Sequence, residues 1–215
     1  MICKTPIVLV VDDDPSVRSS LRRLLQASGY KIQTFADTSN LFVDGRPDSP
    51  CCLILDVHLP EVDGLLFQER LHEMGVRVPI IFITGSGDIE MSVRAMKAGA
   101  VDFLPKPFGR AQLLACVKAA ILDDTQVLEE DRLLAALKQR YATLTPRECA
   151  VFAGVSDGQL NKQVGYDLGI AEKTIKVHRA HVMEKMGAEA LVDLVRMADF
   201  LGIHRQVCER GPQYA

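Results

Sequence analysis

Long apolar runs are absent from this sequence of 215 residues. Its longest apolar stretches, around residues 78–83 and 51–55, are far shorter than the roughly 18 residues that a membrane-spanning helix needs. The N-terminal segment MICKTPIVLVVDDD also lacks the cleavable pattern of a signal peptide, because its apolar run leads directly into acidic residues. We therefore expect a cytoplasmic protein that has no membrane partner.

Paired cysteine motifs are absent as well. The six cysteines include no CxxC pair and do not cluster with histidine at the spacing of metal ligands. This pattern favours cysteines that act as small buried hydrophobic residues in a reducing compartment. A redox switch at the adjacent Cys51 and Cys52 is the alternative.

A strong net charge is also missing, since the formal charge is only −3. The total hides a local basic stretch at residues 172–185, where four Lys or Arg and two His stand against two Glu. Such a bias is weak evidence for an anionic partner unless the fold of this stretch places the basic residues where they can bind one. With 48% hydrophobic and 25% charged residues, the composition is that of a globular protein, and the length suits two small domains.

Short apolar runs alternate with helical patterns in the first half of the chain. Candidate strands lie at residues 7–11, 31–35, 52–56, 79–84 and 100–104. Helical periodicity is found at residues 17–28, 64–75 and 90–99. The alternation predicts a doubly wound α/β domain of about 120 residues, whose five parallel strands take the flavodoxin-like order 2-1-3-4-5.

Polar residues follow these strands where the strands end. Asp12 and Asp13 follow the first, Asp56 ends the third, Thr84 ends the fourth and Lys106 lies just past the fifth. In the flavodoxin-like order, the first and third strands are neighbours at the switch point of the topology. One such residue alone is typical of a turn or cap, but together these five are expected to surround one crevice.

The residue types in that crevice indicate phosphoryl chemistry. Carboxylates that lie close together repel one another, so they either raise their pKa values or hold a cation, and hard oxygen ligands suit Mg²⁺. Asp56 can attack phosphorus as a nucleophile and form an acyl phosphate. Lys106 would neutralise the transferring group, and the Thr84 hydroxyl would donate a hydrogen bond to one of its oxygens.

The second half of the chain is predicted to be helical throughout. Residues 123–141 belong to a stretch without Gly or Pro, which favours a helical linker.

Two sequence pairs, one in each half of the chain, predict helix starts. Asp14 before Pro15 fits an N-cap, and Thr145 with Glu148 three residues later fits a capping box.

Residues 161–187 have the pattern of a helix-turn-helix, with Gly169 in the turn. On the second helix, Lys173, Lys176 and Arg179 stand three residues apart and form a basic band. Such a band can face the major groove of DNA, although basic bands are more often simply solvated. Three apolar residues of the same helix are expected to pack inward: Ile175, Val182 and Met186.

The segments VVDDDPSVR, LDVHLPEVDG, FITGSGD and DFLPKPF resemble the signature segments of the response-regulator receiver domain. The resemblance implies that Asp56 accepts a phosphoryl group from a histidine kinase, while Thr84 and Lys106 sense the phosphorylated state. It implies that Phe103 repacks when Thr84 moves, and that the Lys106-Pro107 bond is cis. The implied Mg²⁺ ligands are Asp12, Asp13, Asp56 and the main-chain carbonyl of His58.

The segments LTPRE, NKQVGYDLGI and KTIKVHRAHVMEKMG resemble the LuxR-type DNA-binding domain, and their position after a receiver resembles the FixJ-like regulators. The residues implied to face base edges are Lys176, Val177 and Ala180. Those implied to lie near phosphates or the DNA backbone are Thr174, His178, Arg179, Lys185, Asn161 and Lys162. The residues implied to form a dimerisation helix are Leu191, Leu194, Val195 and Ala198.

Several positions depart from the pattern of the LuxR-type domain. Ala171 stands where a serine usually caps the second helix, at a cost of roughly 0.5–2 kcal/mol. Gly154 lies inside a helix, which costs up to about 1 kcal/mol relative to alanine. Asp157 replaces an apolar residue and Gly165 replaces a common alanine. An interaction module that no longer binds DNA is therefore an alternative.

Taken together, the sequence predicts a transcription regulator that is not an enzyme. The expected domains are a receiver at 1–122, a helical linker at 123–141 and an all-α four-helix helix-turn-helix domain at 142–208. The expected partners are a cognate histidine kinase, double-stranded DNA, a second copy of the chain on phosphorylation and RNA polymerase. The enzymatic alternative is a metal-dependent aspartyl-phosphate phosphohydrolase. That enzyme would require an acid two residues after the nucleophile, where this sequence has His58.

Overall fold

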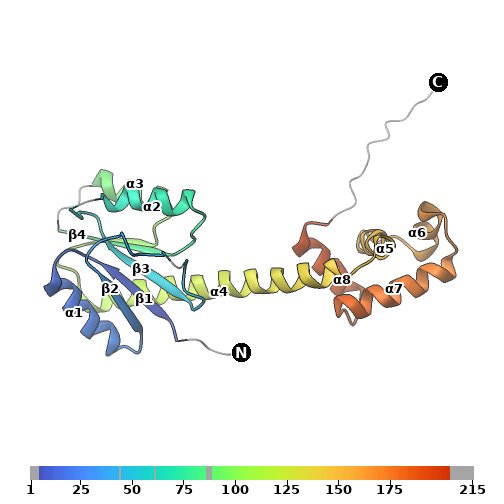
Figure 1. The fold of residues 1–215 in the computed structure, drawn as a ribbon, viewed down its shortest axis with the longest axis horizontal. Coiled ribbons are helices and arrows are strands. Elements are labelled where there is room, and N and C mark those ends of the chain that lie inside the picture. The colour runs from blue at the N-terminus through green and yellow to red at the C-terminus, as the bar shows by residue number, and fades with distance from the viewer. Residues whose placement is uncertain (1–4, 44, 61, 86–88, 204–215) are drawn as a thin grey trace, which may run out of the picture. The chain divides into compact units, whose positions relative to one another are not determined.

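The structure, a computed structural model, describes residues 5–43, 45–60, 62–85 and 89–203. Its contacts divide the chain into two compact units, Met1–Glu129 and Glu130–Ala215, which we call the first and second units. Figure 1 shows a sheet in the first unit and helices alone in the second. The expected end of the second domain at residue 208 lies outside the described residues.

The sheet of the first unit has five parallel strands in the order β2-β1-β3-β4-β5, as predicted. The strands are β1 (Ile7–Val11), β2 (Lys31–Phe35), β3 (Cys51–Asp56), β4 (Ile80–Thr84) and β5 (Asp102–Pro105). Every residue of β1, β3 and β4 is buried, whereas β2 lies at one edge and is partly exposed. Register places Val11 of β1 beside Leu55 of β3, so these strands end side by side.

Two strands begin later than the sequence predicted, β4 by one residue and β5 by two. The expected start of β5 at residue 100 is wrong, because Ala100 still belongs to the end of the preceding helix. Its N–H donates to the carbonyl of Ala95, and the Val101 N–H then donates to the Ile80 carbonyl before the strand begins at Asp102.

Helices cover both faces of the sheet. They are α1 (Pro15–Gln26), α2 (Gly64–Glu73), α3 (Ile89–Lys97) and α4 (Arg110–Ala142). α1 and the first part of α4 pack on one face through Leu21, Leu25, Leu113 and Val117. α2 and α3 pack on the other face, where Leu65, Leu71 and Ala95 are buried. Between β2 and β3, the described residues form turns instead of a covering helix.

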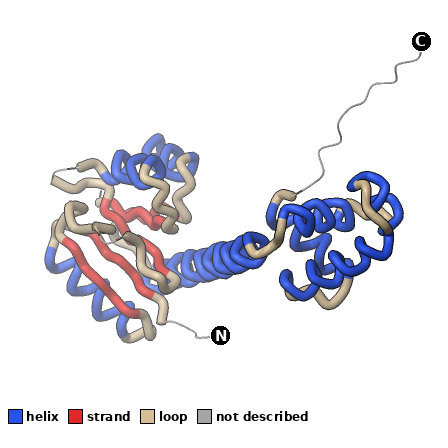
Figure 2. The backbone as a smooth tube through the Cα atoms, turned by 45° about the vertical axis from the view of Figure 1, so that its right-hand side comes forward, coloured by secondary structure: helices blue, strands red, loops and turns tan. Residues whose placement is uncertain are grey.

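The helix α4 is 33 residues long and contributes to both units. Figure 2 shows it as one uninterrupted blue helix. The expected receiver boundary at residue 122 falls inside α4, and the contacts divide the chain between Glu129 and Glu130. Although α4 is long, neither it nor any other helix in the described part of the chain is apolar enough to cross a membrane.

The second unit packs four further helices around one core. They are α5 (Pro146–Ser156), α6 (Asn161–Leu168), α7 (Glu172–Met186) and α8 (Leu191–Leu201). The inward packing predicted for Ile175, Val182 and Met186 is confirmed, since all three are fully buried. Gly169 ends α6 with a left-handed backbone, φ 67°, and forms the predicted turn before α7.

Both predicted helix starts are confirmed. Asp14 caps α1, because its carboxylate accepts the Ser16 N–H at 2.7 Å. Hydrogen bonds from the side chain and the backbone N–H of Ser16 lower the pKa of the Asp14 carboxyl. At α5, the Glu148 N–H donates to the Thr145 hydroxyl at 3.3 Å, and the Thr145 N–H donates to Glu148 Oε2 at 2.8 Å. Two of the unpaired donors at the start of α5 are thereby satisfied.

Two unusual glycines permit close packing in the second unit. A Cβ atom on Gly154 would lie 2.9 Å from Val164, so glycine lets α5 and α6 approach each other. A Cβ atom on Gly165 would lie 2.9 Å from the carbonyl oxygen of Ile170. The cost of glycine in a helix is therefore offset by packing at these positions. Ala171 makes no side-chain cap, as predicted.

The described cysteines behave as small buried residues. Cys51, Cys52 and Cys116 are buried, and Cys149 is half-buried. Burial raises the pKa of Cys51 to about 11 and raises the pKa of Cys52 further, so neither thiol is readily ionised. This environment opposes a redox switch at the adjacent pair, because the reactive species is the thiolate.

Candidate functional sites: an acidic crevice and a helix-turn-helix surface

The predicted crevice forms at the carboxyl ends of β1 and β3. Asp12 follows β1 directly and Asp56 is the last residue of β3, so the register of the two strands brings these residues together. Together with Asp13, their carboxylate oxygens lie within 4.8 Å of one another. Asp12 and Asp56 are buried, whereas Asp13 is exposed. The site is therefore open to solvent on the side of Asp13.

Lys106 joins the two buried carboxylates. Its Nζ atom lies 2.7 Å from Asp12 Oδ2 and 2.6 Å from Asp56 Oδ2. The Lys106 N–H donates to the Thr84 carbonyl at 2.7 Å, so the backbone that carries the lysine is tied to the end of β4. The Lys106-Pro107 bond is cis, as predicted.

Backbone N–H groups hold the other oxygens of the two carboxylates. Asp12 Oδ1 accepts the Asp14 N–H at 2.9 Å, and Asp56 Oδ1 accepts the His58 N–H at 3.0 Å. Both side chains are therefore fixed from two directions before any ligand binds. The His58 side chain is exposed, and a shallow hollow beside the site is lined by Asp13, His58 and Asp63.

Burial and hydrogen bonding shift the pKa values of Asp12 and Lys106 in opposite directions. Burial raises the pKa of Asp12, and the hydrogen bond from Lys106 opposes that rise without cancelling it. Burial would lower the pKa of Lys106, but hydrogen bonds to Asp12 and Asp56 outweigh it and raise that pKa. One ammonium thus pairs with two of the three clustered carboxylates. The remaining negative charge and the hard oxygen donors suit a divalent cation such as Mg²⁺.

Two other predicted residues, Thr84 and Phe103, lie on the strands next to the crevice. Thr84 ends β4 and is fully buried. Phe103 lies on the neighbouring strand β5 and is half-buried, with its ring centroid 6.4 Å from that of Phe82. It packs at the border of the core cluster that includes Ala95 of α3.

Gly64 is a site residue that the sequence reasoning missed. A Cβ atom at this position would lie 2.7 Å from the main-chain oxygen of Asp56 and 3.1 Å from the Cα atom of Val57. Glycine therefore lets the start of α2 pack directly on the backbone that carries Asp56. The sequence places Gly64 at the start of a predicted helix, but only the fold shows what the glycine faces.

The predicted DNA-facing residues lie on α6 and α7, in different environments. Thr174, Lys176, Val177, Ala180 and Lys162 are exposed. Arg179 is half-buried and its Nη1 atom donates to Asn161 Oδ1 at 3.3 Å, which joins α7 to α6. Lys176 pairs with Glu172 one turn earlier at 3.1 Å, and His178 is half-buried.

Lys185 is placed differently from the other basic residues of α7. Its Nζ atom lies 2.6 Å from Glu148 Oε2, and the Glu148 side chain is only 5% exposed. This hydrogen bond, together with the Thr145 N–H, lowers the pKa of Glu148 to about 2. In this structure, the Lys185 charge therefore ties α7 to the start of α5.

The Glu148–Lys185 pair predicts acid sensitivity in the second unit. The pKa of Glu148 is lower in the folded state than its ordinary 4.5, so its stabilising effect is complete above that value and is lost as the pH falls toward 2. Glu148→Gln should destabilise the protein at pH 7, and the difference from wild type should shrink toward pH 2. Urea unfolding followed by circular dichroism from pH 7 to 2 measures this difference. The exposed Glu184→Gln on α7 is the control, and an equal loss at every pH would contradict the prediction.

The expectation for α8 needs a correction. Leu194 and Ala198 cannot form a dimer surface in this fold, because both are buried in the core of their own unit. The exposed apolar residues of α8 are Leu191, Val192 and Phe200.

A second exposed apolar stripe lies on α3 at Ile89, Val93 and Met96. Their spacing of four and three residues places them on one face of that helix.

Comparisons with known proteins match both units. A model described as the response regulator receiver domain matches residues 8–118, and one described as bacterial regulatory proteins of the luxR family matches residues 142–198. The chain is 49% identical to Nodulation protein W of Bradyrhizobium diazoefficiens over 197 residues, covering 92% of this chain and 87% of that protein. It is 40% identical to the response regulator protein TodT of Pseudomonas putida over 198 residues, covering 92% and 87%.

Solved structures give the same result for the fold. The response regulator StyR has a TM-score of 0.81 to this chain at 41% identity, covering 91% of this chain and 99% of that chain. Full-length FixJ from B. japonicum has a TM-score of 0.54 at 36% identity, covering 93% and 98%.

Proposed function

The chain belongs to the response regulators that join a receiver domain to a LuxR-type DNA-binding domain, and from this premise we propose that phosphorylation of Asp56 controls its binding to DNA. The chain is accordingly a regulator of transcription and not an enzyme. One observation carries the proposal: Lys106 holds the buried carboxylates of Asp12 and Asp56 together at the open end of the sheet. We place the protein in the cytoplasm, where its DNA target would be.

Asp56 would accept the phosphoryl group from a phosphohistidine of the kinase. An oxygen of its carboxylate attacks phosphorus, the phosphorus–nitrogen bond breaks, and the histidine nitrogen leaves and takes up a proton. Asp12, Asp13, Asp56 and the His58 carbonyl would hold Mg²⁺, which when bound supplies positive charge that offsets the developing charge on the phosphoryl oxygens. The Lys106 ammonium already contacts Asp56 and would form an ion pair with one oxygen of the phosphoryl group.

Magnesium binding should depend on Asp12 far more than on Asp14. Asp12→Asn removes one of three clustered carboxylates and should weaken Mg²⁺ binding about tenfold or more. Even the loss of a residue that only hydrogen-bonds to a metal ligand lowers metal affinity by about tenfold or more. Asp14→Asn should change little, because Asp14 caps α1 and asparagine is an equally good cap. Calorimetric titration of both variants checks this, and equal affinities would argue against the assignment.

The phosphorylated state would be transmitted through β4 and β5. The Thr84 hydroxyl would bind a phosphoryl oxygen, and the half-buried Phe103 would then repack beside α3. This is a population shift, in which phosphorylation favours one of two packings. The exposed stripe of Ile89, Val93 and Met96 on α3 supports a dimer face there.

A charged residue on that stripe should prevent dimerisation without preventing phosphorylation. Val93 is 44% exposed, so Val93→Asp should leave the fold intact but place a carboxylate in an apolar interface. Leu66→Asp on α2 is a matched control, because Leu66 is 48% exposed on another helix. Analytical ultracentrifugation with a phosphodonor should show dimers for wild type and Leu66→Asp and monomers for Val93→Asp. Dimers in all three would exclude this face.

DNA binding would follow from two helix-turn-helix units held in one dimer. Lys176, Val177 and Ala180 would face base edges, while Thr174 and Arg179 would lie near phosphates. Lys162 and Asn161 would support the contact from α6, and His178 and Lys185 would also lie near phosphates. RNA polymerase would be a further partner. The receiver at 1–122, the linker at 123–141 and the DNA-binding domain at 142–208 remain part of this proposal.

Selection of binding sites from random duplexes tests DNA binding directly. The phosphorylated wild type should enrich a sequence with two half-sites, and Lys176→Ala should relax its preference within each half-site. If no sequence is enriched with or without the phosphodonor, the chain would instead be an interaction module that does not bind DNA.

A further inference from the structure

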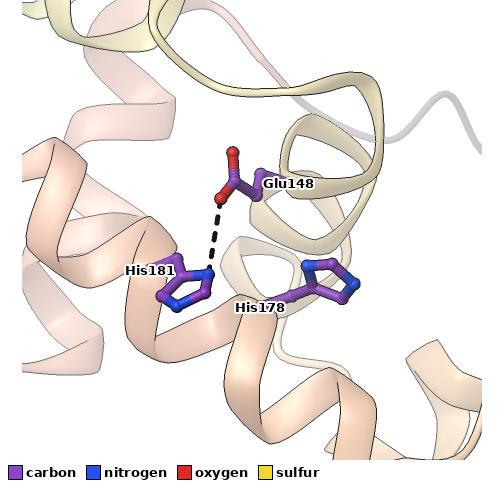
Figure 3. Close-up of side chains that lie close together, drawn as sticks. All are labelled: Glu148, His178 and His181. Carbon is purple, nitrogen blue, oxygen red and sulfur yellow. Dashed lines mark ion pairs between the residues drawn. The ribbon is translucent and has the colours of Figure 1, made fainter.

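Three side chains in the second unit converge between α5 and α7, away from the acidic crevice. They are Glu148 of α5 and His178 and His181 of α7, and one ligand atom of each lies within 4.8 Å of the others. Figure 3 shows the two imidazoles on successive turns of α7, with the Glu148 carboxylate reaching toward His181. The known resemblance to a DNA-binding domain does not account for this grouping.

The fold brings these groups together from distant parts of the sequence. His178 and His181 stand three residues apart on α7 and therefore share one face of the helix. Glu148 lies in the first turn of α5, which packs against α7 through the buried Phe152 and Val182. The His181 side chain is 53% exposed, so the group can be reached from solvent.

The two oxygens of Glu148 have different surroundings. Oε2 accepts the Thr145 N–H at 2.8 Å and the Lys185 ammonium at 2.6 Å, which fixes the carboxylate. Oε1 faces His181 and lies 3.8 Å from its Nδ1 atom. Among the described residues, no side chain or backbone group donates a hydrogen bond to Oε1. One oxygen thus serves the helix cap and the other points toward the imidazoles.

This donor set matches a borderline-soft divalent metal. Two imidazole nitrogens and one carboxylate oxygen are ligands that zinc prefers, whereas magnesium and calcium prefer oxygen alone. Bonds of about 2.0–2.2 Å in a tetrahedral site place neighbouring ligand atoms about 3.4 Å apart. The 3.8 Å between Glu148 and His181 is close to that value, and side-chain rotation of His178 can close the rest.

We propose that Glu148 Oε1, His178 and His181 form a Zn²⁺ site that joins α5 to α7, with water in the fourth position. The ammonium of Lys185 stays on Oε2 and reduces the affinity of the site, but it leaves Oε1 available to the metal. A bound ion would fix the start of α5 against α7. If α7 contacts DNA as proposed above, the ion would also withdraw His178 from that surface, although metal binding itself does not depend on that function.

Calorimetric titration of the full chain with Zn²⁺ tests the site. Excess Mg²⁺ is added to the buffer to compete for the acidic crevice, whose hard oxygen ligands would otherwise bind the added Zn²⁺. The variant is His181→Asn, which removes one ligand at an exposed position. The control is His72→Asn, because His72 is an exposed histidine on α2 outside the cluster.

Wild type and His72→Asn should bind about one Zn²⁺ per chain, and His181→Asn should bind it at least about tenfold more weakly, since loss of even an outer-shell group costs that much. His178→Asn should have the same effect. Nuclear magnetic resonance should show the imidazole signals of His178 and His181 shifting on addition of Zn²⁺. Equal Zn²⁺ affinity in wild type and His181→Asn would overturn the proposal, and so would the absence of saturable binding. Binding that is lost only in Asp13→Asn would also overturn it, because the metal would then occupy the acidic crevice.

Discussion

Replacing Asp56 with asparagine should abolish phosphoryl acceptance. With Mg²⁺ and a small-molecule phosphodonor, wild type should take up about one phosphoryl group per chain, whereas Asp56→Asn should stay at background. The cause is chemical, because an amide is not a nucleophile toward phosphorus while the carboxylate is. Asparagine preserves the size of the side chain and can still accept the His58 N–H. Intact-protein mass spectrometry measures the uptake.

Asp14→Asn is the matched control for this experiment. It removes one carboxylate from the same acidic loop and preserves the cap of α1, so it should be phosphorylated like wild type. Uptake of a phosphoryl group by Asp56→Asn at the wild-type rate would show that another residue is the acceptor.

The second large effect is expected at Asp124, which lies in the segment that the sequence predicts to be a linker. Its side chain is 2% exposed, and its Oδ2 atom accepts the Cys51 N–H at 2.8 Å and pairs with Arg46 at 2.7 Å. Asp124→Ala would leave the largely buried Arg46 charge and the first N–H of β3 without this partner. Breaking such a pair costs about 3–5 kcal/mol, and the 21% exposure of Arg46 favours the lower end, about 3 kcal/mol.

Asp123→Ala is the control for this second prediction, because Asp123 is the exposed neighbour on the same helix. It should change the free energy of unfolding by less than about 0.5 kcal/mol. Urea unfolding measures both variants, and faster hydrogen exchange across β3 should assign the loss to the first unit. Equal stability of the two variants would mean that the pair with Arg46 contributes nothing.

Much of the first unit was predictable because its signals are local. Parallel strands buried on both faces form continuous apolar runs, so β1, β3 and β4 stand out in the sequence. Residues at strand ends inherit their positions from the strand order, which is why Asp12, Asp56 and Lys106 could be brought together in advance. The caps at Asp14 and Thr145 were equally predictable, because each depends on residues only two or three positions away.

The features that escaped prediction depend on contacts between distant parts of the sequence. Asp124 is paired with Arg46 and with the Cys51 N–H, which come from a loop and a strand 78 and 73 residues earlier in the sequence. The α8 residues Leu194 and Ala198 look like a dimer surface until the core of their own unit covers them. In the same way, the pair His178 and His181 is visible in the sequence, but the position of Glu148 beside it requires the packing of α5 on α7.

The most direct measurement is the affinity of the full chain for its selected DNA site, with and without a phosphodonor, at one fixed salt concentration. If phospho-Asp56 controls dimerisation, the wild type should bind at least about tenfold more tightly when phosphorylated, because two half-sites are then engaged together. Asp56→Asn should bind with the same low affinity in both conditions. An unchanged wild-type affinity, or an equal gain in Asp56→Asn, would contradict control through Asp56.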